Sequence, residues 1–348
     1  MSKQLYFAAL LFLYLFAAFR FEVGCDWGTY RMMHLVTLDP LEDLWVRVLT
    51  EPFFIFSSKI IHFFNLEYYW MNVLTTSIFF LGIHKLALRS SDPLSYIILL
   101  FPILIINMPM SAVKQGAAIG MVCMAFCAFF DKRLLKYVIF IVLAGGFHLS
   151  ALIFLALVPF VGGPLTLKRA FFGSMIALPI IGLIALSSYA DLAVNRYIES
   201  NNPEAAGAVF RIGVLIFGMS MFFFFFKNKW KLQFPNQYSL MLLAALMTLV
   251  LLMLLPISSV LSDRFGYYLI PILTIFFVSI PTFRNLQLRP LWISAPYLGL
   301  ILIFITWTSL STHFKVCYQP YKSWVIGVPE KERYYGDINE KEEASLSP

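Results

Sequence analysis

Long apolar runs, separated by short polar segments, are the dominant pattern of this chain. A transmembrane helix needs roughly 20 mostly apolar residues, and runs of about that length recur along the sequence. They predict spans at residues 4–19, 67–86, 94–108, 115–130, 169–187, 209–226, 238–258, 266–281 and 291–311. The pattern predicts an integral membrane protein. Its first run is interpreted as a retained span, because no small-residue cleavage site follows it.

The segment 41–66 is too polar for a simple lipid-facing span. If it crossed the membrane, Lys85 and Arg89 would lie outside. If it lies on the outer surface or re-enters, both fall inside, as the positive-inside rule prefers. We therefore interpret the segment as interfacial or re-entrant. Its polar residues are Glu42, Asp43, Arg47, Glu51, Lys59 and His62.

The segment 137–161 is long enough for one span, but residues 145–148, with two glycines and a histidine, interrupt it. Two short helices that meet near His148 would place Lys168 and Arg169 inside, whereas one span would place them outside. Broken helices at membrane depth are tolerated where they line a cavity. We therefore predict an all-α, polytopic transmembrane helical bundle of about eleven helices, including short or broken ones. The N-terminus lies inside and the C-terminal tail outside.

Composition agrees with a membrane protein. Hydrophobic residues make up 60% of the chain and charged residues 13%, whereas soluble domains have about 25% charged residues. The net charge of +7 fits Lys and Arg held in cytoplasmic loops, so the expected partner is the lipid bilayer and not nucleic acid. Residues 1–311 are predicted to form one polytopic membrane domain, and residues 312–348 a polar C-terminal tail that is partly disordered.

On this topology, polar residues gather on the side opposite the basic loops. Charged side chains that face the interior of a membrane protein are costly and are usually functional. The cluster therefore suggests a site for a lipid-linked anionic substrate. Its members are Arg20 to Tyr30, Glu51, Lys114, Gln115, His148, Arg196 and Asp263 to Tyr268.

Arg264 stands between two apolar spans, and its planar guanidinium suits a phosphate or pyrophosphate. The alternative is a structural ion pair between Asp263 and Arg264, or an interfacial anchor. Tyr267 and Tyr268 either stack on a sugar ring or belong to the interfacial belt of aromatic residues.

The loop from Arg20 to Tyr30 carries a second set of candidates. Arg20 is a candidate anion ligand and Asp26 a candidate proton acceptor, unless the loop is simply solvated. Tyr30 follows Asp26 at a helix-like spacing and is a candidate hydrogen-bond partner for it.

Three further positions are candidates. Lys114, with Gln115, opens a span and is either an interfacial lysine or a second phosphate contact. His148 lies at the predicted hairpin tip, where it would carry a proton or bind phosphate unless it is structural. Glu51, before Pro52, is another candidate base.

Common soluble catalytic motifs are missing from the sequence, including the P-loop, HExxH, paired CxxC and GxSxG. No Asp-x-Asp pair is present to hold a nucleotide-sugar metal, which favours a metal-independent reaction without a cofactor. The four cysteines show no metal-ligand spacing. Cys25 and Cys317 are able to pair if both lie outside the cytoplasm, but the sequence gives no distance between them.

The motifs, taken in order, resemble the EpsG-type branch of the Wzy polysaccharide polymerases. Lys114 departs from the family pattern, which usually has Arg there, because Lys keeps the charge but lacks the bidentate fork. The matching pieces are Arg20-Phe21-Glu22-Val23-Gly24-Cys25-Asp26 with Tyr30, Glu51-Pro52-Phe53-Phe54, Lys114-Gln115, Phe147-His148-Leu149-Ser150-Ala151, and Arg264 with Tyr268.

The resemblance implies a glycosyltransferase that polymerises O-antigen or exopolysaccharide repeat units, as in lipopolysaccharide biosynthesis. Such enzymes work at the periplasmic face of the bacterial inner membrane. They transfer the growing glycan from undecaprenyl pyrophosphate to the non-reducing end of a lipid-linked repeat unit, and a chain-length regulator is a candidate partner. Cations must stabilise the departing pyrophosphate. Arg20, Lys114 and Arg264 are candidates for this, and Asp26, Glu51 or His148 for the base.

Three other functions compete with a polymerase. A flippase or other transporter of lipid-linked sugars predicts inverted repeats and charges at mid-membrane, and the sequence has no evident repeat. A multispanning acyltransferase would need a different order of motifs. An O-antigen ligase uses the same donor, and it would be favoured by a large loop between late spans, whereas 188–208 is only moderate in length.

Overall fold

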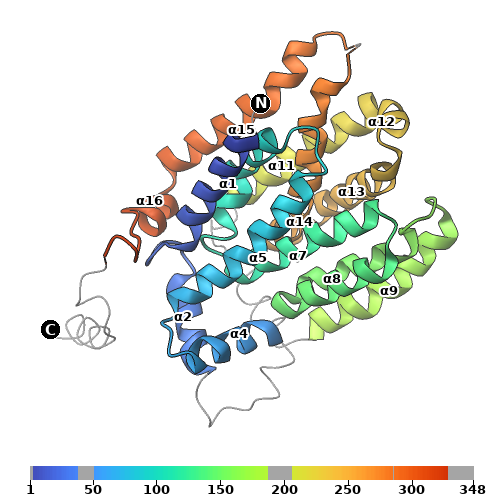
Figure 1. Cartoon of the computed structure of the whole chain (residues 1–348). Coiled ribbons are helices and arrows are strands. Elements are labelled where there is room, and N and C mark those ends of the chain that lie inside the picture. Colours follow the sequence, from blue (N-terminus) through green and yellow to red (C-terminus); the bar gives the residue numbers. More distant parts are fainter. Residues whose placement is uncertain (1–2, 38–50, 187–205, 285, 328–348) are drawn as a thin grey trace.

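The computed structural model describes residues 3–37, 51–186, 206–284 and 286–327. In this part of the chain the fold is all-α, as predicted, and its one β interaction is an isolated bridge between Arg20 and Ser323. Figure 1 shows the helices. The elements are α1 (Lys3–Ala18), α2 (Trp27–Val36), α4 (Pro52–Phe63), α5 (Tyr69–Ala87), α6 (Pro93–Leu100) with η1 (Phe101–Ile105), α7 (Val113–Phe130), α8 (Leu134–Phe147), η2 (Leu149–Phe160), α9 (Leu167–Leu186), α11 (Ala206–Met221) with η5 (Phe222–Phe226) and α12 (Lys227–Gln233), α13 (Pro235–Leu254), α14 (Ser259–Ser279) with η6 (Ile280–Thr282), α15 (Arg289–Leu310) and α16 (Thr312–Tyr318).

Five helical stretches of the described chain are long and apolar enough to cross a membrane, and five shorter apolar helices accompany them. Two of the long ones, α7 and α14, are mostly buried inside the bundle, whereas α15 is exposed along nearly its whole length. An apolar helix that is buried on all sides belongs to the core, and one that is exposed needs lipid around it. The chain is a multi-pass membrane protein.

α5 and α7 pack at backbone distance because glycines meet at their crossing. A Cβ atom on Gly82 would collide with the carbonyl oxygen of Gly120, and one on Gly120 would lie 2.5 Å from the carbonyl oxygen of Ile78. Small residues allow such close approach between membrane helices, where dispersion contacts drive packing. This contact sets the position of α7, whose first turn carries Lys114 and Gln115.

α8 and η2 form the predicted hairpin. The hydroxyl of Tyr137 donates to the carbonyl oxygen of Phe154 at 2.7 Å, and Gly162 lies beside the side chain of Lys132. His148 joins the two helices in an extended conformation, with φ −151°. The two feet of the hairpin are therefore at one end of the bundle and His148 is at the other.

The basic loops gather at one end, as the charge argument predicts. Arg89 and Asp131 form two hydrogen bonds, of 2.8 and 2.9 Å, where α5 and α7 end. Gln237, at the start of α13, donates to the carbonyl oxygen of Arg89 at 3.1 Å. α12 lies at this basic end, away from α2, α4 and α16 (Figure 1). The end that carries α2, α4 and α16 is called the outer end below.

α4 lies across the outer end. At its start, Glu51 lies beside His148, and at its finish Ile61 packs in one cluster with Tyr68, where α5 begins. Both ends of α4 are thus at the same end of the bundle, so this part of the segment 41–66 does not cross the bundle, and its place at the membrane surface stays a prediction. Residues 41–50, with Glu42, Asp43 and Arg47, lie outside the described residues, as does Arg196.

The last buried helix begins earlier than the hydrophobic pattern predicts. α14 starts at Ser259 and not at residue 266, because the side chain of Ser258 caps it by accepting a hydrogen bond from the Leu261 N–H at 3.3 Å. Asp263 and Arg264 therefore lie within the first two turns of α14, and their side chains point in directions set by the helix.

Replacing Gly120 by Leu should destabilise the protein by on the order of 2 kcal/mol or more, because the larger side chain forces α5 and α7 apart. Thermal unfolding of the detergent-solubilised protein measures the change. Gly299→Leu is the matched control, since a Cβ at Gly299 meets nothing within 4 Å. Equal unfolding temperatures for the two variants would refute the glycine contact.

Candidate active site

Four of the predicted site residues lie at or near helix ends. Glu51 immediately precedes Pro52 at the first position of α4, where a missing N–H does no harm. Lys114 is the second residue of α7, His148 joins the hairpin helices, and Arg264 lies near the start of α14. The ends of several helices therefore bring distant parts of the sequence together at the outer end.

Glu51, Lys114 and His148 form the centre of the site. Lys114 Nζ pairs with Glu51 Oε2, and less than one tenth of either residue is exposed. His148 Nδ1 lies 3.6 Å from Glu51 Oε1. The Lys114 ammonium also lies 5.3 Å from the ring centroid of Tyr30 and 5.2 Å from that of Phe54. A cation placed over ring faces is attracted to them, so Lys114 is held by one acid and two aromatic rings.

Burial and the two nearby cations set the protonation states at this centre. Burial raises the pKa of the Glu51 carboxyl, although Lys114 and Arg264 oppose the shift. Burial, together with the charges of Arg264 and Lys114, lowers the pKa of His148 to about 3. His148 is therefore neutral at pH 7, which suits a hydrogen-bonding role better than the binding of phosphate as a cation.

Arg264 is the second cation of this centre. Its charge interacts with Tyr30, Glu51 and His148. Gln115 Nε2 donates to the backbone oxygen of Arg264 at 2.6 Å, so Gln115 ties the start of α7 to α14.

Tyr268, one turn after Arg264, joins α14 to the hairpin. Its hydroxyl lies 3.1 Å from Ser150 Oγ, and Glu51 and Arg264 interact with it electrostatically. Tyr268 is fully buried in the described fold and contacts the ring of Phe154 at 5.4 Å between centroids. These contacts place it inside the bundle, so membership of the interfacial belt does not describe it.

The ion pair between Asp263 and Arg264 that the sequence left open is not formed. Asp263 instead binds Arg211 of α11 through two bonds of 2.6 and 2.7 Å. Adjacent residues on a helix do not face each other, so Asp263 and Arg264 point to different partners. Arg211 is not among the residues predicted for the site, although an arginine inside a predicted span is itself a signal of a buried partner.

Arg20 is engaged within the N-terminal loop. Its guanidinium donates to the carbonyl oxygens of Ala17 at 2.6 Å and Val23 at 3.0 Å, and to Asn72 Oδ1 at 2.9 Å. The side chain is 1% exposed. These bonds stabilise the loop that leads to Asp26. A contact between Arg20 and pyrophosphate stays a prediction.

Tyr30 links Asp26 to the centre formed by Glu51, Lys114 and His148. Ser111 Oγ donates to Asp26 Oδ2 at 3.3 Å, and the Tyr30 N–H bonds to the backbone oxygen of Asp26 at 2.9 Å. The charges of both Asp26 and Glu51, after burial, raise the pKa of Tyr30. Tyr30 therefore stays protonated at neutral pH and interacts electrostatically with both carboxylates.

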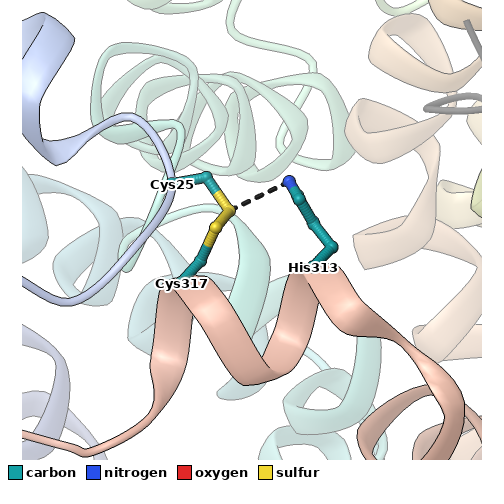
Figure 2. A group of neighbouring side chains, drawn as sticks. All are labelled: Cys25, His313 and Cys317. Atoms are coloured by element: carbon teal, nitrogen blue, oxygen red, sulfur yellow. Dashed lines mark hydrogen bonds between the residues drawn. A yellow bond between two sulfur atoms is a disulfide. The ribbon is translucent and has the colours of Figure 1, made fainter. Parts of the chain in front are cut away.

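Cys25 and Cys317 form a disulfide, with 4.8 Å between their Cα atoms. Figure 2 shows His313 beside it, with Nε2 at 3.0 Å from the sulfur of Cys25. The ligand atoms of these three residues lie within 4.8 Å of one another. Cysteine binds a metal through its thiolate, and the two sulfur atoms of a disulfide are not thiolates. Cys25 and Cys317 therefore do not act as metal ligands while they are joined.

Comparison with protein families gives one match. Residues 3–323 match the family described as the EpsG family, and this range contains every predicted site residue. The comparisons with curated proteins and with solved structures each give no match.

Replacing Lys114 by Met should destabilise the protein, because the buried Glu51 would lose its cation; breaking one partner of a buried pair costs roughly 3–5 kcal/mol. The double variant Lys114→Met/Glu51→Gln removes both charges and should regain most of the loss. Thermal unfolding of the two purified variants measures the difference. A double variant as unstable as the single one would contradict the pairing.

The loss in Lys114→Met should also depend on pH. Without Lys114, the folded pKa of Glu51 rises further above the unfolded value of about 4.3, so the folded state binds the proton more tightly. Stability then falls as pH rises from the unfolded to the folded pKa. We expect a smaller deficit at pH 5 than at pH 8, and an equal deficit at both would argue against a buried carboxyl.

Proposed function

The chain belongs to the EpsG family, and on that premise we propose that it is a polysaccharide polymerase, a metal-independent glycosyltransferase of the bacterial inner membrane. Its substrates are undecaprenyl-pyrophosphate-linked oligosaccharides. The growing glycan is transferred to the non-reducing end of a new lipid-linked unit, and the product is O-antigen or exopolysaccharide. A chain-length regulator is a candidate partner.

The observation that carries this proposal is the buried pair of Glu51 and Lys114, with Arg264 close by and neutral His148 at 3.6 Å. Transfer of a glycan from a pyrophosphate needs an acceptor for one proton and positive charge for the leaving group. Glu51 supplies the first, and Lys114 and Arg264 supply the second. A flippase has no need of a base beside two cations.

The proposed step balances as follows. The oxygen of the acceptor hydroxyl attacks the anomeric carbon of the donor glycan, and its proton passes to the Glu51 carboxylate. The bond between that carbon and the pyrophosphate oxygen breaks, and its electron pair leaves with the lipid pyrophosphate. When the pyrophosphate engages Lys114, Glu51 loses part of its counter-charge and becomes a better base.

His148 and Asp26 have supporting roles in this proposal. Neutral His148 orients the Glu51 carboxylate or the acceptor hydroxyl. Asp26, held by Ser111, is the second candidate for the base. Tyr30 and Tyr268 contact the substrate, and Gln115 positions Arg264.

Two features support a site that faces the periplasm. Disulfides persist in oxidising compartments, and the Cys25–Cys317 bridge lies at the outer end with the site. The basic loops lie at the opposite end, where the positive-inside rule expects the cytoplasm. The loop 188–208, which bears on the ligase alternative, lies largely outside the described residues.

The test is a lipopolysaccharide gel from a host that lacks the gene and carries it back as wild type, Arg264→Ala or Arg89→Ala. We expect deletion to reduce the ladder to core plus one repeat unit, and wild type to restore it. Loss of one leaving-group donor should lower polymer about 100-fold or more, so Arg264→Ala should not restore the ladder.

Arg89→Ala is the matched control, because Arg89 forms a partly exposed ion pair at the basic end and such pairs are worth about 0–1 kcal/mol. Membrane levels of each variant are compared by immunoblot. Loss of the single repeat unit in the deletion would point to a flippase or a ligase. An unchanged ladder together with unchanged capsule and secreted glycan would refute a polymerase.

A further inference from the structure

We infer that Arg211 is a positioning residue for Arg264. It holds one face of α14 and thereby fixes the rotation of that helix about its axis. The inference rests on the proposed function, because Arg264 is assigned there to the leaving pyrophosphate. It extends the site to α11, which contributes none of the predicted site residues.

Arg211 contacts two successive turns of α14. Its Nε and Nη2 donate to the two carboxylate oxygens of Asp263 at 2.6 and 2.7 Å. Its guanidinium carbon lies 5.3 Å from the ring centroid of Tyr267. A bidentate fork fixes the relative orientation of the two groups that it joins, and a guanidinium is attracted to the face of an aromatic ring. The two contacts together therefore determine which face of α14 is turned toward α11.

Glycines let α11 and α14 pack closely around this contact. A Cβ atom on Gly266 would lie 2.8 Å from Ile212 Cδ1 and 3.1 Å from Leu215 Cδ1. A Cβ atom on Gly207 would lie 2.8 Å from Arg211 Nη1, so the guanidinium lies back over the first turn of α11. Such close packing resists a rotation of α14 and restricts the rotamer of Arg211.

The neighbouring face of α14 carries the site residues. Residues four apart lie on one face of a helix, and successive residues are about 100° apart around its axis. Arg264 and Tyr268 therefore share a face, which is rotated by one residue from the face that Arg211 holds. The Tyr268 hydroxyl lies 3.1 Å from Ser150 Oγ beside the hairpin tip, so this face is turned toward the centre of the site.

Two other bonds hold the start of α14 between its neighbours. Gln115 Nε2 donates to the backbone oxygen of Arg264 at 2.6 Å, and Ser262 Oγ donates to the carbonyl oxygen of Leu251 in α13 at 2.8 Å. The pair of Arg211 with Asp263 adds a direction to this placement. It is mostly buried, and apolar residues in place of a buried ion pair are often as stabilising. The pair therefore contributes orientation more than stability.

The experiment replaces Arg211 by Lys, which keeps a positive charge beside Asp263 but lacks the fork and the flat guanidinium. Purified protein is supplied with the radiolabelled undecaprenyl-pyrophosphate-linked repeat unit extracted from the deletion host, and the rate of polymer formation per folded protein is measured. A misplacement of about 1 Å is enough to cost roughly 100-fold in rate. We expect Arg211→Lys to be at least about tenfold slower than wild type, with a similar unfolding temperature. A role limited to neutralising Asp263 predicts an unchanged rate, and that result would overturn the inference.

Arg89→Lys is the matched control, because Arg89 forms the same kind of two-bond pair, with Asp131, at the basic end. It should keep the wild-type rate, since no predicted site residue lies beside it. An equal loss of rate in Arg89→Lys and Arg211→Lys would mean that weakening any such pair slows the protein, and the inference would fall.

A double-mutant cycle tests whether Arg211 acts through Arg264. Arg264→Gln removes the guanidinium that is to be positioned, so adding Arg211→Lys should slow the residual rate no further. A merely structural role for Arg211 predicts that the two losses multiply. Multiplied losses would therefore contradict the inference.

A neutral pair decides the question if Arg211→Lys does not accumulate in the membrane. Arg211→Gln/Asp263→Asn leaves no buried charge without a partner, but it lacks the ionic fork. We expect the same loss of at least about tenfold in rate per folded protein. The wild-type rate in this variant would refute a positioning role.

The proposed function and the role of Arg211 fail in different ways. If wild type restores no polymer to the deletion host, the proposed function falls and the inference falls with it. If wild type restores the polymer and Arg211→Lys is equally active, only the inference falls.

Discussion

A charge held away from water needs a partner, and the pair of Glu51 and Lys114 meets this requirement at the point where the outer end of the bundle is assembled. Glu51 immediately precedes a helix that lies across the outer end of the bundle, and Lys114 lies in the first turn of a buried candidate span. The pair fixes these two helices relative to each other, and His148 adds the hairpin. The geometry of the site follows from the need to compensate one buried carboxyl and one buried ammonium.

Arg20, Arg211 and Arg264 have different environments at this end of the bundle, and the environment decides what each can do. Arg20 donates to two backbone oxygens and one amide, so it stabilises a loop. Arg211 is bound twice by Asp263 and so joins α11 to α14. Arg264 acts electrostatically on Glu51, Tyr30 and His148. Sequence motifs treat arginines alike, whereas partners and burial separate them.

Much of the fold was predictable because it depends on local patterns. Apolar runs indicate the spans, and the glycines before His148, together with the side on which Lys168 must lie, indicate the hairpin. The prediction that Glu51, Lys114 and His148 lie at one end of the bundle followed from counting how often the chain crosses the membrane before each residue. The pair of Arg211 and Asp263, the early start of α14 and the disulfide were not predictable in this way. Each depends on a contact between distant segments or on one cap, which hydropathy does not report.

The disulfide has a topological consequence. It joins residues 292 positions apart, so nearly the whole polypeptide lies within one covalent ring. Cys317 follows the last long apolar helix of the described residues, and therefore the ring closes only after the ribosome has made all five candidate spans found there. A chain truncated before Cys317 retains Asp26, Glu51, Lys114 and Arg264 but lacks the bridge. Closure of the ring thus reports that the long apolar helices of the described chain have all been made.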